Sequence, residues 1–366
     1  MRGVECSYAV SKEPTPEYNS VIPWQPSNQR PAGATAECFR PARQVPDALL
    51  WQYYLSYAGG TLAATGSDRA YAEMWQTCVP AVAHSDPGTS HALMALSALC
   101  LISNEPDLHG TALDYHSTAM HHYTASVRLL RESISVPEKA AADALLACSM
   151  LLIPCGIAFA RKTASPTSEW LHHLRGFRAL GDALNESDGI ANAEHQLIPF
   201  PQDGIPEQQI HIVSRGRHSK ATLLCNLIRC SRHRALDKLR AAVAASDPAS
   251  DPLDTEAYVL AIEQLQYVMD YVVECRTSNY LRAIFSWSTQ VSPRFVMLLG
   301  SRDELAIAIG VHWIVLTLLL HDLWFVKGFG AFRIETVTAR FEQSRSINLW
   351  LLDWPREVLR QWLLFE

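Results

Sequence analysis

The 366-residue sequence lacks the short motifs by which several large enzyme classes are identified. It contains no Gly-x-Ser-x-Gly, no Gly-x-Gly-x-x-Gly, no Walker loop and no His-Glu-x-x-His. The usual signatures of α/β-hydrolases, dinucleotide-binding enzymes, P-loop nucleotidases and zinc peptidases are therefore missing. These absences do not exclude catalysis by positioning alone, for example a cyclisation or isomerisation in an apolar cavity.

Paired cysteines are also missing, although cysteine itself occurs nine times. No two cysteines form the Cys-x-x-Cys pair that usually begins a structural zinc site, and the chain is long for a disulfide framework. We expect the cysteines to be small buried side chains in a reducing compartment. They are Cys6, Cys38, Cys78, Cys100, Cys148, Cys155, Cys225, Cys230 and Cys275.

Charge is scarce and not basic. Charged residues make up 19% of the chain, hydrophobic residues 48%, and the net charge is −6. This composition predicts a large packed core and argues against a surface that mainly binds nucleic acid. A polar, proline-rich beginning predicts no signal peptide. The apolar run 305–320 is shorter than the ~20 residues of a membrane span and contains His312, so we expect a buried core helix and no membrane span.

Prolines divide the chain into two parts. They are frequent up to Pro46, which predicts a disordered linker over residues 9–46, and residues 186–216 read as a long loop. Period-two alternation is too short for a sheet, so we predict an all-α fold with one large helical domain over residues 47–366. The predicted helices are 47–55, 68–77, 89–103, 113–133, 138–160, 168–184, 220–245, 255–274, 281–299, 304–326 and 334–351. The first should end near Gly59-Gly60, the second should break around Pro80, Thr89 or Ser90 would cap the third, and Pro154 would kink or break the helix over 138–160.

The first residues, Arg2-Gly3-Val4-Glu5-Cys6-Ser7-Tyr8, resemble the last stretch of the fungal binuclear zinc-cluster DNA-binding module. We therefore interpret residues 1–8 as the remnant of such a module. Cys6 would be the last of its six zinc ligands. One cysteine cannot hold a tetrahedral zinc ion, so we expect no cofactor in this chain, and zinc only where the rest of the cluster is present.

The body carries a second resemblance that spans roughly residues 47–360. It is similar to the fungal-specific transcription factor domain, closest to the branch of the sterol uptake control regulators. The segments that carry this resemblance are Met74-Trp75, Val79 to Pro87, His91 to Leu99, Tyr115-His116, Ala119, His121-His122-Tyr123, Trp170-Leu171, Leu174-Arg175-Gly176, Trp287, Phe295-Val296, Leu299, His312-Trp313, Trp324, Lys327 to Gly330 and Trp354-Pro355.

The resemblance implies an all-helical regulatory domain that is often dimeric and, in the sterol-responsive branch, encloses an apolar pocket for a lipid-like ligand. It implies a nuclear regulator of RNA polymerase II transcription, shuttling with the cytoplasm, that controls a metabolic gene set. Partners would be a second copy or a related regulator, a sterol-like or other apolar small molecule, and DNA only through a missing or partner module.

The candidate ligand pocket is a cluster near the C-terminus: His312, Trp313, His321, Trp324 and Phe329. A few polar groups in an apolar pocket orient a ligand, and Lys327 to Gly330 would form the pocket mouth. A hydrogen-bonded core histidine explains His312 equally well, and a helix C-cap explains the glycines. The pairs His121-His122 and His172-His173 are poor chelators because helix neighbours point apart. The basic stretch 220–240 reads as a solvated helix face.

Two other functions stay open. The first is a repurposed helical domain that binds or transforms an apolar metabolite without contacting DNA. The second is an interaction protein that dampens full-length relatives by dimerising with them. Turnover of a metabolite by the purified chain would favour the first of these alternatives.

Overall fold

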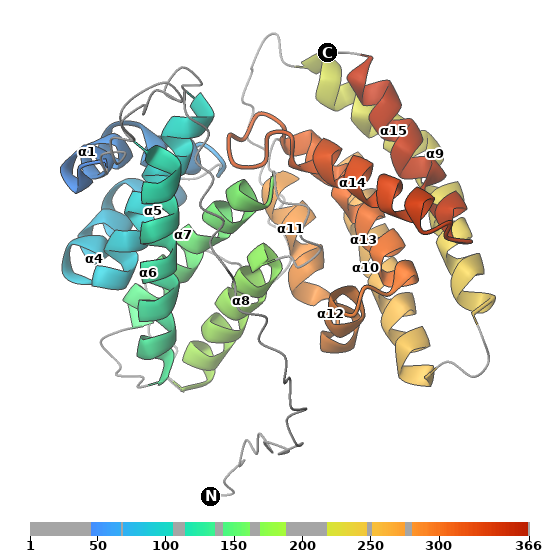
Figure 1. The fold of residues 1–366 in the computed structure, drawn as a ribbon, viewed down its shortest axis with the longest axis horizontal. Coiled ribbons are helices and arrows are strands. Elements are labelled where there is room, and N and C mark those ends of the chain that lie inside the picture. The colour runs from blue at the N-terminus through green and yellow to red at the C-terminus, as the bar shows by residue number, and fades with distance from the viewer. Residues whose placement is uncertain are drawn as a thin grey trace, which may run out of the picture. The chain divides into compact units, whose positions relative to one another are not determined.

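In a computed structural model, the protein is built from helices (Figure 1). The structure describes residues 45–66, 69–104, 114–135, 142–161, 169–187, 218–246, 251–274 and 280–364. None of these residues lies in a strand, which confirms the predicted all-α fold. Every described residue belongs to one compact unit, Ala42–Glu366. The predicted remnant, nearly all of the predicted linker and most of the loop 186–216 lie outside the described residues.

The first helices of the unit are interrupted by two wide π-helical turns. The chain forms α1 (Asp47–Tyr53), the π-turn η1 (Tyr54–Ala58) and α2 (Gly59–Ala63), then α3 (Arg69–Glu73), the π-turn η2 (Met74–Cys78) and α4 (Val79–Ser85). The two turns are joined by the buried hydroxyl of Tyr54, which donates to the carbonyl oxygen of Trp75 at 3.0 Å. Such turns are rare and widen the helix locally.

Two predicted helix ends in this part were wrong. Gly59 and Gly60 do not end a helix but begin α2. Gly59 allows a close approach instead, because a Cβ atom there would lie 3.0 Å from the Tyr54 ring and 3.3 Å from the carbonyl oxygen of Trp75. Pro80 likewise lies in the first turn of α4, where proline is tolerated, and does not break the chain of helices.

Four long helices follow: α5 (Pro87–Asn104), α6 (Tyr115–Ser135), α7 (Ala142–Ala160) and α8 (Glu169–Ser187). The extensive contacts are between α5 and α6, α5 and α7, and α7 and α8. As predicted, α5 is buried on nearly every face. Its N-cap was predicted at Thr89 or Ser90, but Asp86 performs that role, because its Oδ2 atom accepts from the Thr89 amide at 2.6 Å. Pro154 lies within α7, which continues past it to Ala160, so of the predicted kink or break the break is absent.

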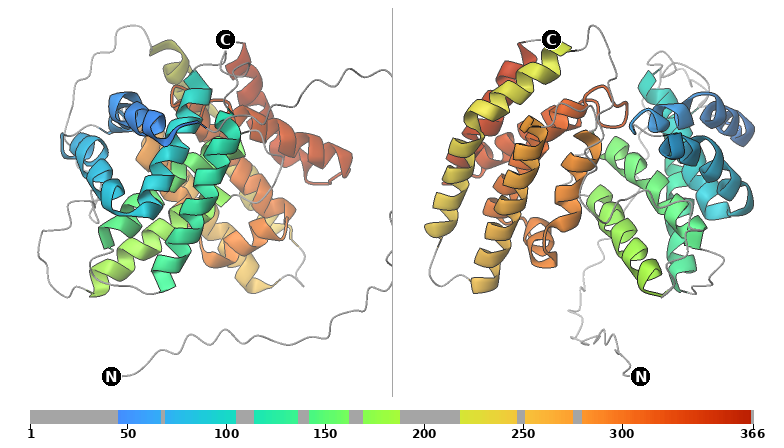
Figure 2. Two further views of the ribbon diagram at one scale, coloured as in Figure 1. Left: turned by 60° about the vertical axis from the view of Figure 1, so that its left-hand side comes forward. Right: turned by 180° about the vertical axis from the view of Figure 1, so that it is seen from behind.

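The second half of the unit contains α9 (His218–Ala244), α10 (Pro252–Glu274), α11 (Tyr280–Gln290) and α12 (Pro293–Gly300). Helices α9 and α10 lie side by side, and α10 also contacts α11 and α12 (Figure 2). The single helix predicted over 281–299 is thus two helices. Ser292 separates them because its side chain accepts from the Phe295 amide at 3.1 Å and so caps α12.

The last elements are α13 (Glu304–Leu316), the 3-10 turn η5 (Thr317–Leu320), α14 (Phe329–Gln343), the 3-10 turn η6 (Leu349–Leu352) and α15 (Asp353–Leu363). Helix α14 ends at Gln343, so the helix predicted over 334–351 is too long. Helix α15, which contains Pro355, was not predicted. The proline falls in its first turn, where it is tolerated.

Helix α13 and η5 show why the apolar run 305–320 need not cross a membrane. Nearly all of these side chains are buried in the protein core, as predicted. By length and composition, α7 is able to cross a membrane, and α12 with the segment Glu304–Leu320 forms a bent pair that passes the same test. Most of α7 is also buried inside the fold. We therefore interpret both as core helices of a packed domain.

Candidate functional site

His312 lies on α13 and is 1% exposed. Its Nδ1 atom lies 2.8 Å from the carbonyl oxygen of Ala308, one turn earlier, and its ring stacks on Trp354 with 5.2 Å between centroids. Burial lowers the pKa of His312 to about 4, so the imidazole is neutral at pH 7. These contacts are those of a hydrogen-bonded core histidine, which the sequence left open as the alternative to a ligand anchor.

Trp313 is the next residue on α13 and points to a different neighbour. Its ring stacks on Trp287 of α11, with 5.3 Å between centroids and 18° between planes. The indole Nε1 donates to the carbonyl oxygen of Ile284 at 2.6 Å. Trp313 is 1% exposed. It therefore joins α11 to α13 in the core.

His321 follows η5 and has one buried atom without a partner. Its Nε2 atom lies 3.3 Å from Oδ1 of Asp322, and its ring meets the edge of Trp362, with 4.8 Å between centroids. The Nδ1 atom is buried and has no hydrogen-bond partner. In the neutral tautomer whose ring hydrogen is on Nε2, facing the carboxylate, Nδ1 is an acceptor. Of the predicted pocket residues, His321 has the clearest unused polar group.

Trp324 is held from both sides. Its indole Nε1 donates to Oγ1 of Thr61 at 3.1 Å. Its carbonyl oxygen accepts from Nη1 of Arg161 at 2.5 Å and from Oγ of Ser103 at 3.2 Å. These bonds connect the segment after η5 to α2, α5 and the end of α7. Trp324 thus lies where the first and second halves of the unit meet.

Phe329 begins α14 directly after Gly328, which has a φ of 79°. This left-handed conformation favours glycine. The guanidinium of Arg333 lies 5.6 Å from the centre of the Phe329 ring. Gly330 is packed closely, because a Cβ atom there would lie 2.7 Å from Oγ1 of Thr317. Gly328 therefore directly precedes α14, and Gly330 packs closely within its first turn. The C-cap suggested by the sequence was wrong.

The five predicted residues do not share one contact. They pack against Trp354, Trp287, Trp362, Thr61 and Arg333, respectively. Each of the five is already engaged with the fold. The apolar ligand pocket at these residues stays a prediction, and Cys6 lies outside the described residues.

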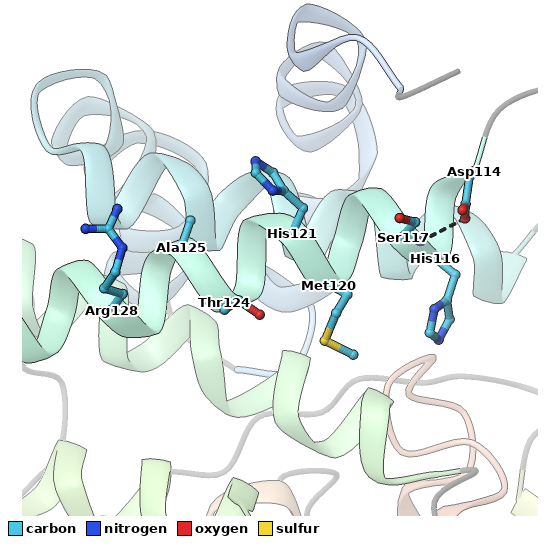
Figure 3. A pocket seen from close by; sticks show the side chains of 8 residues that line it. All are labelled: Asp114, His116, Ser117, Met120, His121, Thr124, Ala125 and Arg128. Carbon is cyan, nitrogen blue, oxygen red and sulfur yellow. Dashed lines mark hydrogen bonds between the residues drawn. The ribbon is translucent and has the colours of Figure 1, made fainter. Parts of the chain in front are cut away.

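A pocket lies elsewhere, along the outer face of α6 (Figure 3). It is an open trough of about 730 Å³. The described residues that line it are Asp114, His116, Ser117, Met120, His121, Thr124, Ala125 and Arg128. Sequence reasoning named His116 and His121 but not this trough, because it pointed to histidine pairs and not to the exposed face of a helix.

Three histidines from α5 and α6 come together beside this trough. Nδ1 of His91 lies 2.8 Å from Nδ1 of His122, and the ring of His121 lies within 6.3 Å of both by centroid distance. Nε2 of His122 lies 3.5 Å from Oδ1 of Asp47. Burial lowers the pKa of His91 and of His122, and one of the two facing nitrogens must be unprotonated for their hydrogen bond to form. His91 was not singled out as a partner by the sequence.

Another imidazole forms a short hydrogen bond between α6 and α8. The Tyr123 hydroxyl lies 2.6 Å from Nε2 of His173, and the two rings meet edge to face. Burial lowers the pKa of His173 to about 4.

Across the part of the chain that the structure describes, no group of three or more His, Cys, Asp or Glu side chains is arranged to hold a metal ion.

The cysteines with described positions are mostly buried. Cys100, Cys148, Cys155 and Cys225 are buried, Cys78 is partly exposed and Cys230 is exposed. Burial raises the pKa of the Cys100 and Cys148 thiols to about 12, so these thiols are poor nucleophiles. The predicted role as small buried side chains is correct for these four and wrong for Cys230.

The basic stretch of α9 is used for packing within the protein. Nε of Arg232 lies 2.6 Å from Oδ1 of Asp270 on α10. Lys238 pairs with Asp353 at 3.6 Å, and Lys220 lies 5.5 Å from the centre of the Trp362 ring. Several of these cations therefore face α10 and α15. The prediction of a solvated face was correct only in part.

The comparisons with known proteins point to one family. No curated protein matches the chain. Residues 48–200, less than half of the 366, match the family described as "Fungal specific transcription factor domain". The matched region begins in α1 and includes α2 to α8. In residues 48–200 this chain is thus similar to the fungal specific transcription factor domain, which supports a fungal transcriptional regulator.

Proposed function

We propose that this protein is a nuclear regulator of fungal transcription that controls a metabolic or biosynthetic gene set. The observation that carries the proposal is the match of residues 48–200 to the fungal specific transcription factor domain. The all-helical fold of the described residues agrees with it. The net charge of −6 agrees with a regulatory domain that does not itself bind DNA.

Contact with DNA would then come from a zinc-cluster module outside the described residues or on a partner. The resemblance of residues 2–8 to the end of such a module supports this part of the proposal. The partner would be a second copy of the chain or a related regulator. The protein would shuttle between nucleus and cytoplasm as part of its control.

The proposed effector is an apolar molecule that carries one hydroxyl group, of which a sterol is an example. His321 supports this choice because its buried Nδ1 atom is an acceptor without a partner. A ligand hydroxyl would donate to Nδ1. A buried hydrogen bond of this kind contributes about 1 kcal/mol and fixes the ligand's orientation.

Binding of a fluorescent sterol to the purified chain tests the effector. We expect His321→Phe to weaken binding by about tenfold, and a sterol without its hydroxyl to bind the original chain equally poorly. His233→Phe, an exposed histidine on α9, is the matched control. Equal binding of both sterols by the original chain would contradict the assignment of His321.

Fusion of the full chain to an unrelated DNA-binding domain tests the regulatory role. We expect the fusion to change transcription of a reporter gene that carries the matching DNA site. Leu96→Asp, which places a carboxylate at a fully buried position of α5, should abolish the change because it unfolds the domain. A fusion that accumulates in the nucleus and leaves the reporter unchanged would contradict a regulatory function.

The alternative is a domain that transforms an apolar metabolite, and one observation favours it. The hydrogen bond between Tyr123 and His173 pairs a proton donor with a neutral imidazole inside the fold, an arrangement suited to acid–base chemistry. This alternative predicts turnover by the purified chain that Tyr123→Phe abolishes.

A further inference from the structure

A stripe of exposed side chains runs along α10 with the spacing of a helix-binding surface. Its apolar members are Leu253, Leu260 and Tyr267, which are seven residues apart, and Val259 beside them. All four are exposed, Tyr267 at 61% and Leu253 at 59%. At 100° per residue they share one side of the helix. We call these four, together with Glu256 and Glu263, the α10 stripe.

The two carboxylates of the stripe have no cation partner among the described residues. Glu256 and Glu263 are exposed and fall between the apolar members. The arginines that contact α10 are engaged with other side chains. Arg240 of α9 donates to Gln266 of α10 and pairs with Asp237 at 3.2 Å. Arg232 pairs with Asp270 at 2.6 Å, and Arg294 pairs with Asp251 at 2.9 Å and with Asp254 at 2.5 Å. The stripe is therefore apolar and acidic.

An exposed apolar row rimmed by charge of one sign is typical of a docking site. The opposite face of α10 is fully used, since Ala261, Leu265 and Met269 are buried in the core. The exposed apolar residues thus do not contribute to folding of this chain. They are available to a partner helix that lies along α10.

We propose that the α10 stripe binds a basic amphipathic helix of a partner protein. Apolar side chains of that helix would pack between Leu253, Leu260 and Tyr267, as in helix pairs with a seven-residue repeat. Its lysines or arginines would pair with Glu256 and Glu263, which sets the preference for a basic partner. A second copy fits less well, because two stripes facing each other bring carboxylates against carboxylates in either orientation.

The test uses two fluorescein-labelled designed helical peptides with identical leucine repeats, one with lysine and one with glutamate at the flanking positions. Anisotropy with the full chain should show that the lysine peptide binds at least about tenfold tighter. Leu260→Asp should weaken its binding by at least about tenfold. Leu55→Asp, which changes an exposed leucine on η1 outside the α10 stripe, should leave binding unchanged.

Charge reversal tests the preference for a basic partner more directly. The double variant Glu256→Lys with Glu263→Lys should prefer the glutamate peptide. These residues are exposed, so the variant keeps its fold, which circular dichroism checks. Equal binding of both peptides, or an unchanged preference after charge reversal, would overturn the proposal. So would self-association of the original chain that Leu260→Asp abolishes, because the occupant would then be a second copy.

Discussion

The imidazole of His312 stacks on the indole of Trp354, with 5.2 Å between ring centroids and 17° between ring planes. This contact joins α13 to α15. The indole Nε1 of Trp354 also donates to Oγ of Ser231 on α9, at 2.7 Å. One aromatic side chain therefore connects three helices, and the C-terminal helix is an integral part of the core.

Trp354→Ala should lower the free energy of unfolding by about 3 kcal/mol, because it removes a large packed ring and a hydrogen bond. Urea denaturation followed by circular dichroism measures the change. Trp350→Ala is the matched control, since Trp350 is 40% exposed on η6, and it should cost less than about 1 kcal/mol. Equal losses in the two variants would contradict the role given to the stack.

Stability should fall as the pH is lowered from about 6.5 towards 4. The pKa of buried His312 in the folded protein is about 4, whereas an unfolded histidine titrates near ~6.5. Between these values the unfolded chain takes up a proton and the folded chain does not, which favours unfolding. For His312 the loss at pH 5 is about 2 kcal/mol.

His312→Leu should therefore reduce the difference between the unfolding free energies at pH 7 and at pH 5. Urea titrations at the two pH values measure this difference. His233→Leu, at an exposed position of α9, should leave it unchanged. If the His312 variant keeps the full difference, His312 is protonated in the folded protein at pH 5 and its burial has been misjudged.

Gly330→Ala should destabilise the protein by about 1–3 kcal/mol. The added Cβ would lie 2.7 Å from Oγ1 of Thr317 and 2.9 Å from Cδ2 of Leu318. Gly176→Ala on α8 is the control, because a Cβ there has no neighbour within 4 Å. That change should stabilise by up to about 1 kcal/mol, since alanine favours helix over glycine. Thermal unfolding of both variants shows whether each change raises or lowers stability.

Arg161→Met should lower the free energy of unfolding by about 2 kcal/mol. The change removes charge-assisted hydrogen bonds from Nη1 to the carbonyl oxygen of Trp324 and to the hydroxyl of Ser103. Hydrogen exchange should also speed up in the segment around Trp324. Arg128→Met, which breaks an exposed ion pair with Glu132, should cost less than about 1 kcal/mol. Unchanged exchange near Trp324 would show that Arg161 does not hold this segment.

The helical class was predictable because apolar residues recur at helical spacing through most of the described chain. Helix ends were less predictable. Gly59 and Pro80 looked like terminators, but tertiary packing allows glycine at a close approach and proline in a first turn. The π-turns have no sequence signal of their own. The hydrogen bond from Tyr54 to Trp75 that joins them forms only in the folded structure.

The candidate residues were harder to interpret. The sequence placed His312 and Trp313 side by side but could not show that they stack on Trp354 and Trp287 in different parts of the core. It also could not bring His91 to His122, because these residues meet only when α5 packs on α6. Residue type located the polar groups of the core. Their partners are set by tertiary packing.

Transcript levels in the host fungus test the central proposal most directly. They would be measured in three strains that carry the original gene, a deletion of it, or the Leu96→Asp variant. We expect a defined set of metabolic genes to change together in the deletion strain, and the variant strain to show the same change. Unaltered transcripts, together with accumulation of one apolar metabolite in the deletion strain, would contradict a regulator and favour an enzyme.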